Sequence, residues 1–213
     1  YLLTANEGEP SDDYKIDPEG SFTLIDLTNG AQNATVKQIM LNNVKLPAGA
    51  RIVKPGSSFE EDAEPEYIAF SPDGKKAYAT LQENNAIATI DIASAKVISV
   101  SGLGFKNVSR ISHDVSNKDG GINMKRWPVL MMYQPDAIVA YETKGSTYLV
   151  TANEGDSKDY DGFSEETRVG KLKLDKTMFP NANELQKKEN LGRLKTTKTL
   201  GDTDGDGDHD IIY

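Results

Sequence analysis

A strand-and-turn segment occurs twice in this chain, and it limits the possible folds more than any other feature. Residues 1–9 read Tyr-Leu-Leu-Thr-Ala-Asn-Glu-Gly-Glu, and residues 148–156 read Tyr-Leu-Val-Thr-Ala-Asn-Glu-Gly-Asp. Each copy predicts an apolar strand that ends at an Asn-Glu-Gly turn and continues into an acidic loop with a tyrosine, Tyr14 or Tyr160. A strand that recurs together with its loop indicates an all-β repeat architecture.

A third unit lies between the two copies and predicts how the strands pair. Residues 64–93 contain three predicted strands at 67–70, 76–81 and 86–92, and the first turn reads Ser-Pro-Asp-Gly. Residues 21–26 align with the last of these strands. Three antiparallel strands at this spacing make up most of a propeller blade, which has four. We therefore expect a β-propeller with little helix, apart from about two helical turns at 183–190.

Long polar insertions separate the repeats. The intervals between Tyr1, Tyr78 and Tyr148 exceed the ~40–50 residues of compact propeller repeats. Predicted loops at 46–62, 106–127 and 157–167 account for the difference, and loops of this length in a compact domain tend to carry binding function.

Composition excludes several classes of protein. The 213 residues carry a net charge of −9, which argues against nucleic acid or an anionic membrane as the main partner. Cysteine is absent, so disulfides and thiolate metal sites are excluded, and no apolar run approaches the ~20 residues of a membrane-spanning helix. The chain starts within a predicted strand and lacks an initiator Met, so we expect the remainder of the propeller, with any signal peptide, to lie outside it.

Eight motifs stand in one order along the chain, at residues 4–14, 17–20, 64–67, 81–86, 133–136, 151–156, 160–166 and 201–208. Taken in this order, they resemble the choice-of-anchor I family, which includes proteins similar to mesenchyme-specific cell surface glycoprotein and some labelled alkaline phosphatase. The resemblance implies an extracellular or cell-surface propeller of roughly seven blades, of which this chain supplies about three as one partial domain, residues 1–213.

An acidic loop near the end predicts a Ca²⁺ site. Asp202, Asp204, Asp206 and Gly207 match positions 1, 3, 5 and 6 of an EF-hand loop, whereas position 12 is Tyr213 instead of a bidentate Glu. The departure allows a different register, a dockerin-like or thrombospondin-like loop, or a ligand from elsewhere in the fold. The alternative is a solvated acidic loop without metal. The candidate metal ligands are Asp202, Asp204, Asp206, Asp208 and Asp210.

Acidic residues also follow the corresponding strands of the repeats, and Glu66 and Asp136 each stand before the first strand of a unit. Equivalent strand ends lie on one face of a propeller, so these side chains are expected to surround one opening. The alternative is that Asn-Glu-Gly and Glu-Asn-Asn only make tight turns. The candidate ligand-binding residues are Glu7, Glu9, Glu66, Glu83, Asn84, Asp136, Glu154 and Asp156.

These observations favour a calcium-binding propeller that recognises a polar ligand or a cell-surface or matrix component without catalysis. No nucleic-acid partner and no membrane insertion are expected. One alternative is a secreted metal-dependent phosphoesterase, alkaline phosphatase- or phytase-like, that uses Glu7, Glu83 and Glu154. With only His113 and His209 as imidazoles, calcium suits this alternative better than zinc. A structural repeat in which calcium only stabilises the fold is a third class.

Overall fold

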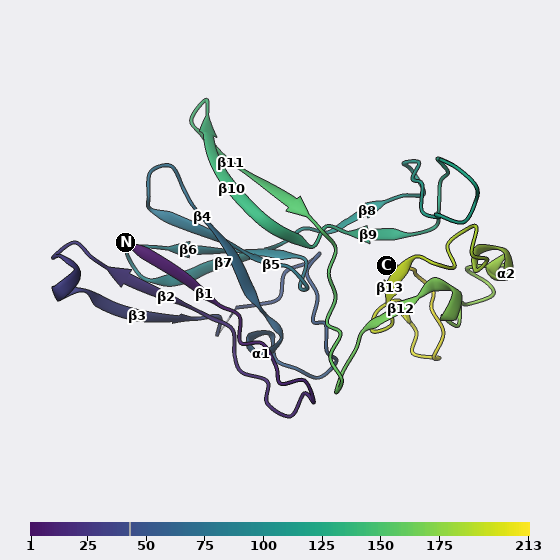
Figure 1. Ribbon diagram of the computed structural model, residues 1–213, viewed down its shortest axis with the longest axis horizontal. Coiled ribbons are helices and arrows are strands. Elements are labelled where there is room, and N and C mark those ends of the chain that lie inside the picture. Colours follow the sequence, from purple (N-terminus) through teal and green to yellow (C-terminus); the bar gives the residue numbers. More distant parts are fainter. Residues whose placement is uncertain (43) are drawn as a thin grey trace. The chain divides into compact units, whose positions relative to one another are not determined.

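The computed structural model describes residues 1–42 and 44–213, and it confirms an all-β chain with little helix. The described residues form thirteen strands in antiparallel sheets. They divide into two compact units (Figure 1). Unit 1 comprises residues 1–104, 133–156 and 160–163, and unit 2 comprises residues 105–132, 157–159 and 164–213. Among the described helices, none has the length and apolar character required to cross a membrane.

The first sheet of unit 1 has the strand order β1-β2-β3, formed by β1 (Leu2–Asn6), β2 (Ser21–Asp26) and β3 (Thr35–Met40). All its pairs are antiparallel and in unbroken register. Phe22 and Leu24, two positions apart on β2, are buried, because alternate residues of a strand share one face.

The second sheet contains the predicted three-stranded unit and one further strand. Its order is β4-β5-β6-β7, formed by β4 (Pro65–Phe70), β5 (Lys76–Leu81), β6 (Ala86–Asp91) and β7 (Lys96–Gly102). The turn between β4 and β5 follows the Ser-Pro-Asp-Gly sequence, with the N–H of Gly74 donating to the carbonyl of Ser71 at 2.8 Å. Small buried residues on β5 and β6 permit close packing on this sheet. They are Ala77, Ala79, Ala86 and Ala88.

A long hairpin completes the strands of unit 1. It consists of β10 (Pro135–Thr143) and β11 (Ser146–Asn153), and β10 also packs against β4. Lys144 and Gly145 both have positive φ, 50° and 73°, as a two-residue type I′ turn requires. The core of unit 1 is formed by aliphatic and aromatic residues of the first two sheets together with Phe59 and Ala63.

Unit 2 is built mainly from irregular chain around a separate core. Its short strands are β8 (Phe105–Asn107) paired with β9 (Leu130–Met132), and β12 (Glu166–Arg168) paired with β13 (Lys195–Thr197). Trp127 packs in the core of this unit. The other buried members are Val108, Val129, Val169, Leu172, Leu174, Phe179, Leu185, Leu191 and Ile212.

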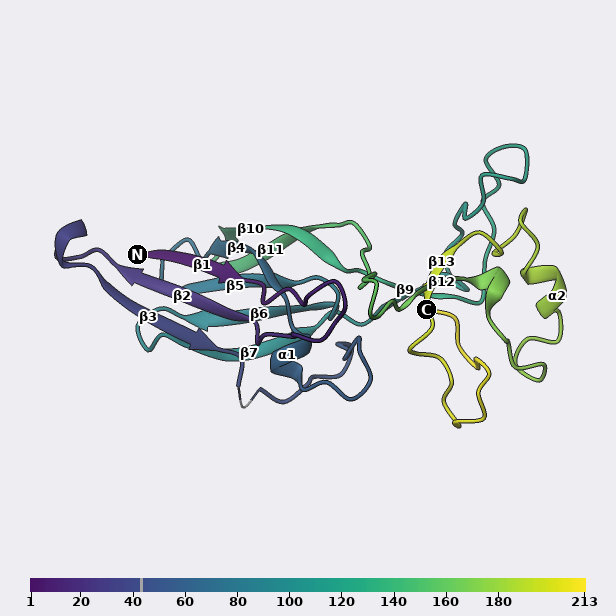
Figure 2. The same cartoon turned by 60° about the horizontal axis from the view of Figure 1, so that its bottom comes forward.

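The helices differ from the prediction in length and position. The helix expected at 183–190 is limited to α2 (Ala182–Leu185), because the chain turns back there and the N–H of the buried Leu191 donates to the carbonyl of Leu185 at 2.9 Å. The predicted loop at 46–62 ends in α1 (Phe59–Asp62), a short helix that Figure 2 shows. It begins at a capping box between Ser58 and Glu61.

Candidate functional site

The acidic loop of unit 2 is closed at its base by Gly201. The carbonyl oxygen of Gly201 accepts hydrogen bonds from the N–H groups of Asp210 at 2.7 Å and Ile211 at 3.1 Å. Gly201 has a φ of 107°, and a Cβ added there would lie 2.3 Å from the carbonyl oxygen of Ile211. Position 201 therefore requires glycine. The two hydrogen bonds to its carbonyl oxygen hold the ends of the loop formed by residues 202–210 together.

Hydrogen bonds from the backbone orient the carboxylates within this loop. Asp202 accepts from the N–H groups of Gly205 at 2.7 Å and Gly207 at 2.9 Å, one through each oxygen. Asp206 accepts from the N–H of Asp208 at 3.0 Å. The glycines at 205 and 207 have φ of 80° and 86°, which explains their position between the acidic residues.

Two groups of carboxylates converge in and beside the loop. Oxygens of Asp202, Asp204 and Asp210 lie within 4.8 Å of one another, and so do oxygens of Asp175, Asp208 and Asp210. Ligands on opposite sides of a Ca²⁺ ion, each ~2.3–2.6 Å from it, are separated by about the same distance. Asp210 belongs to both groups, and Asp206 belongs to neither.

Asp175 is a candidate ligand that sequence analysis missed. It is far from the loop in sequence, but Leu174 forms a parallel bridge with His209. The N–H of His209 donates to the carbonyl of Lys173 at 2.8 Å, and the N–H of Asp175 donates to the carbonyl of His209 at 3.1 Å. No local sequence motif predicts this pairing, because it depends on how the chain of unit 2 folds back on itself.

The charges around these groups are unevenly compensated. Lys173 lies 3.4 Å from one oxygen of Asp208, whereas the other oxygen of Asp208 is buried without a hydrogen-bond partner. Both ring nitrogens of His209 are also buried without one. Hydrogen bonds from the side chain and then the backbone of Thr203 hold the pKa of Asp210 below its usual value, so Asp210 is poised as an anionic ligand.

A second concentration of acidic residues lies in unit 1, and we call it the acidic turn cluster: Glu7, Glu64, Glu66, Asp136 and Asp156. Burial, followed by the negative charges of the other four carboxylates, raises the pKa of Glu66 to about 7. With its amide nitrogen turned toward Glu66, Gln82 donates to both carboxylate oxygens at 3.2 Å. The strand ends of the repeats thus bring like charges close enough to perturb one of them.

The two loop tyrosines pack on each other beside this cluster. The ring centroids of Tyr14 and Tyr160 lie 5.4 Å apart, and Phe163 packs on Tyr14 at 5.3 Å. Burial first, and then nearby carboxylates, raises the pKa of both tyrosines. For Tyr160 those carboxylates include Glu9 and Glu83.

Buried oxygen atoms without a donor accompany these residues. The fully buried side chain of Asn84 donates to Asp62 at 2.7 Å and to the carbonyl of Arg51 at 3.1 Å, but its oxygen accepts no hydrogen bond. The hydroxyl of Tyr14 and one oxygen of Asp17 are likewise buried without a partner. Such atoms are costly to leave unsatisfied, and they mark a place where a cation, donor group or water would be stabilised.

The remaining candidate, Glu154, lies at an exposed turn. Its N–H donates to the carbonyl of Gln134 at 3.2 Å, and its carboxylate is not one of the four that raise the pKa of Glu66. Within the described residues, the groups of three carboxylates with converging oxygens are both in unit 2, not in the acidic turn cluster. The acidic turn cluster therefore differs from the loop at residues 202–210, because its described carboxylate oxygens do not form a converging group of three.

Together, these features define an all-β repeat protein with a carboxylate-rich loop. The chain belongs to the choice-of-anchor I domain family, whose sequence pattern it matches over residues 1–213. It is 36% identical over 125 residues to the mesenchyme-specific cell surface glycoprotein of Strongylocentrotus purpuratus, a match that covers 57% of this chain and 16% of that protein. Hydrazine synthase of Kuenenia stuttgartiensis is a weak structural match, with a TM-score of 0.28 and 15% identity over 67% of this chain and 44% of the other.

Proposed function

We propose that this chain is part of a calcium-binding β-propeller that recognises a polar ligand at a cell surface or in an extracellular matrix, without catalysis. Membership of the choice-of-anchor I family and the likeness to a cell surface glycoprotein support this location. The partner expected on these grounds is a cell-surface or matrix component.

The three sheets of unit 1 support the propeller part of the proposal. The β4-β5-β6-β7 sheet has the strand number and the antiparallel order of a complete blade. The β1-β2-β3 sheet and the β10-β11 hairpin flank it in packing, because β1 and β10 both contact β4. Under this proposal β4 is the strand of its blade nearest the central channel. Unit 1 then contributes about three of roughly seven blades to one domain that spans residues 1–213.

The single observation that carries the calcium proposal is the convergence of two carboxylate groups on Asp210. Asp202 and Asp204 reach it from the loop, and Asp175 and Asp208 form the second group with it. Ca²⁺ accepts six to eight oxygen ligands in flexible geometry, so a single Ca²⁺ ion can be bound by both groups of carboxylates. Mg²⁺ suits them less well, because it requires a strict octahedron. Asp206 is then a charged neighbour and not a ligand.

The acidic turn cluster is the recognition site in this proposal. Unit 1 offers three features to a ligand: the carboxylates of the cluster, the buried side-chain oxygen of Asn84 that accepts no hydrogen bond, and the paired tyrosines. Together they suit a ligand that carries positive charge and hydrogen-bond donors.

A metal-dependent phosphoesterase is a second candidate, favoured by one observation. Glu66 has a pKa near 7, the value that suits general acid or base catalysis at neutral pH. Phosphoryl transfer also needs a metal held near the reacting oxygens, and neither described group of converging carboxylates includes Glu66 or another member of the acidic turn cluster. Recognition without turnover is therefore the function that the geometry supports better.

Two assays on the intact chain separate these functions. We expect no turnover of phosphomonoesters, phytate or phosphodiesters with Ca²⁺, Zn²⁺ or Mn²⁺, and retention on an array of glycans and matrix proteins. Retention should be lost by Glu66→Gln and kept by Glu142→Gln, an exposed carboxylate of the β10-β11 hairpin. Metal-dependent turnover that disappears in Glu66→Gln would establish the phosphoesterase instead.

A further inference from the structure

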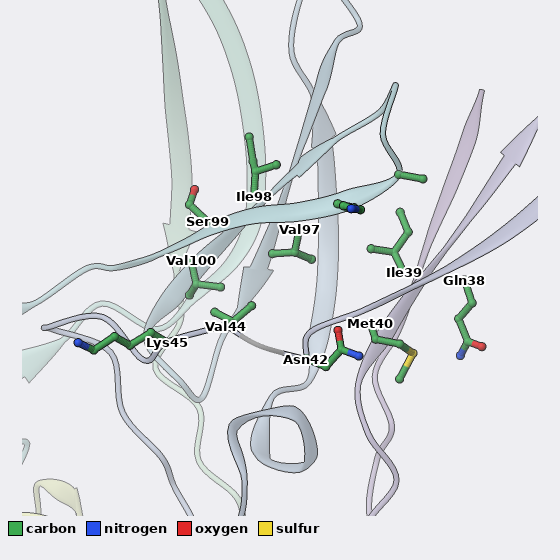
Figure 3. A pocket seen from close by; sticks show the side chains of 12 residues that line it. Gln38, Ile39, Met40, Asn42, Val44, Lys45, Val97, Ile98, Ser99 and Val100 are labelled. Atoms are coloured by element: carbon green, nitrogen blue, oxygen red, sulfur yellow. The ribbon is translucent and has the colours of Figure 1, made fainter.

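A groove of about 690 Å³ lies between strands β3 and β7 of unit 1 (Figure 3). Its apolar lining is formed by Ile39, Met40, Val44, Val97 and Val100. Each strand is the last of its sheet, so among residues 1–42 and 44–213 no strand pairs with the outer edge of either one. The groove therefore combines apolar side chains with backbone donors and acceptors that an added strand can use.

The two edges differ in their capacity to pair. β3 follows β2 in unbroken register from Thr35 to Met40. The register of β7 on β6 shifts between Val97 and Ser99, so that Ile98 forms a bulge. Figure 3 shows Ile98 and Ser99 on one side of β7 and Val97 and Val100 on the other, toward Val44. A bulge prevents regular pairing along an edge, so β3 is the edge that is open to a new strand.

Lysines surround the groove in a chain whose net charge is −9. Lys45 and Lys96 line it, and Lys37 lies on the same face of β3 as Ile39, two residues away. All three lysines are exposed, and the described lining residues include no carboxylate.

Two carboxylates at the ends of neighbouring strands are engaged in their own turns. Asp26 accepts from the hydroxyl of Thr28 at 2.6 Å, and Asp91 accepts from the hydroxyl of Ser94 at 2.6 Å. Both carboxylates stay charged, and Asp91 is the cross-strand partner of Lys96. Neither carboxylate lines the groove, whose charged lining residues are Lys45 and Lys96, so the lining itself presents positive charge to an incoming segment.

We propose that the β3–β7 groove binds an extended acidic segment of a partner protein, which adds as a strand to the free edge of β3. Alternate apolar side chains of this segment pack on Val97 and Val100, and carboxylates on either side of the apolar stretch lie near Lys45 and Lys96. A second copy that pairs symmetrically through its own β3 edge is a poorer occupant, because it would bring the same lysines face to face.

A defined peptide tests this assignment on the intact chain. The probe has three valines separated by threonines, with two glutamates at each end. One control peptide has lysines in place of the glutamates, and another carries N-methyl groups on the backbone of the apolar stretch. We expect the acidic peptide to shift the NMR amide signals of residues 35–40, and each control peptide to bind at least tenfold more weakly.

Matched charge reversals test the same surface from the side of the protein. Lys45→Glu with Lys96→Glu should weaken the acidic peptide at least tenfold, whereas Lys75→Glu with Lys144→Glu, at exposed turns of unit 1, should change its affinity less than threefold. Equal binding of acidic and basic peptides, no binding of any peptide, or shifts confined to other strands would overturn the proposal. The proposal would also be overturned if the chain associated with itself and the Lys45→Glu and Lys96→Glu substitutions changed that association. Such a result would assign the groove to a second copy.

Discussion

The rings of Tyr14 and Tyr160 pack edge to face, with centroids 5.4 Å apart and an interplanar angle of 78°. These tyrosines occupy the acidic loops that follow the two copies of the repeated strand. The loops also meet through their backbones, where the N–H of Gly162 donates to the carbonyl of Asp12 at 2.8 Å. A Cβ on Gly162 would lie 2.2 Å from the carbonyl oxygen of Asp13, so this approach requires glycine.

The hydroxyl of Tyr14 is buried without a hydrogen-bond partner, which gives a test of its role. Tyr14→Phe should raise the free energy of unfolding by up to about 1 kcal/mol, because it removes an unsatisfied polar group and keeps the ring contacts. Tyr14→Ala should lower it by about 3 kcal/mol, because the packing on Tyr160 and Phe163 is lost. Urea denaturation measures both. A loss of more than about 1 kcal/mol in Tyr14→Phe would show that the hydroxyl is bonded in solution.

Glu66 should make the stability of unit 1 depend on pH. Its pKa in the folded protein, about 7, is above the ordinary value of 4.5, so the folded state binds its proton more tightly than the unfolded state. The stabilisation is fully present below pH 4.5 and is lost as the pH rises through 7. At pH 8, Glu66→Gln should raise the free energy of unfolding by about 1 kcal/mol, a value reduced for the partial exposure of the side chain.

The test is the difference in free energy of unfolding between Glu66→Gln and the wild type, measured as a function of pH. The gain should vanish at about pH 4, where Glu66 is protonated in the folded state and largely so in the unfolded state. An identical effect of Glu66→Gln at acidic and alkaline pH would contradict the raised pKa.

Asn85 connects the end of the first segment of unit 1, at Gly104, to the start of its second segment, at Tyr133. Its side-chain nitrogen donates to the carbonyls of Gly49 at 3.0 Å and Gly104 at 2.7 Å, and its oxygen accepts from the N–H groups of Tyr133 at 2.9 Å and Gln134 at 3.1 Å. The residue is fully buried and has a φ of 54°.

Asn85→Ala should therefore lower the free energy of unfolding by about 4 kcal/mol, because buried donors and acceptors lose their partners. Asn85→Gly should cost about 1 kcal/mol less, since glycine adopts a positive φ without strain. Asn29→Ala, at an exposed turn, should stay within about 0.5 kcal/mol of the wild type. Chemical denaturation would refute this account if Asn85→Ala behaved like the Asn29 control.

Asp204 and Asp206 offer a matched test of which loop carboxylates bind the ion. Both are exposed and each accepts a backbone hydrogen bond, but only Asp204 belongs to a converging group. Asp204→Asn should weaken Ca²⁺ binding at least tenfold, about 1.4 kcal/mol, whereas Asp206→Asn should weaken it less than threefold. Equal losses in calorimetric titrations would mean that net charge, and not ligation, controls affinity.

Asp175 should behave as a ligand even though it lies outside the loop. Asp175→Asn keeps the side-chain oxygen that accepts from the N–H of Met178 at 2.5 Å, so the local turn is preserved. The substitution should weaken Ca²⁺ binding at least tenfold with little change in the stability of the calcium-free protein. Unchanged affinity would confine the site to residues 202–210.

The strands and turns of the repeats were predictable because local rules determine them. The strands at 76–81 and 21–26 are confirmed to the residue, since alternating side chains and Pro-Gly or Asn-Gly turns are properties of short segments. β7 and the short strands of unit 2 were missed, because their residues lack regular alternation and their pairing is set by distant chain. The capping box at Ser58 was a readable helix signal that was overlooked.

The candidate sites show the same division between local and distant information. The acidic loop can be recognised in the sequence from its alternating aspartates and glycines. The proximity of Asp175 cannot, because it arises from the pairing of Leu174 with His209. Likewise, repeat alignment placed Glu7 and Asp156 after corresponding strands and Glu66 and Asp136 before the first strand of a unit. The involvement of Glu64 and the packing of Tyr14 on Tyr160 require the folded chain.

Calorimetric titration of the intact chain with Ca²⁺ tests the central claim most directly. The account predicts one ion per chain with a Kd of about 10⁻⁴–10⁻³ M or tighter, in the range of extracellular calcium modules. It also predicts that Asp210→Asn, which removes a carboxylate shared by both converging groups, abolishes the heat of binding. The absence of any Ca²⁺ binding to the correctly folded wild-type chain would contradict the account.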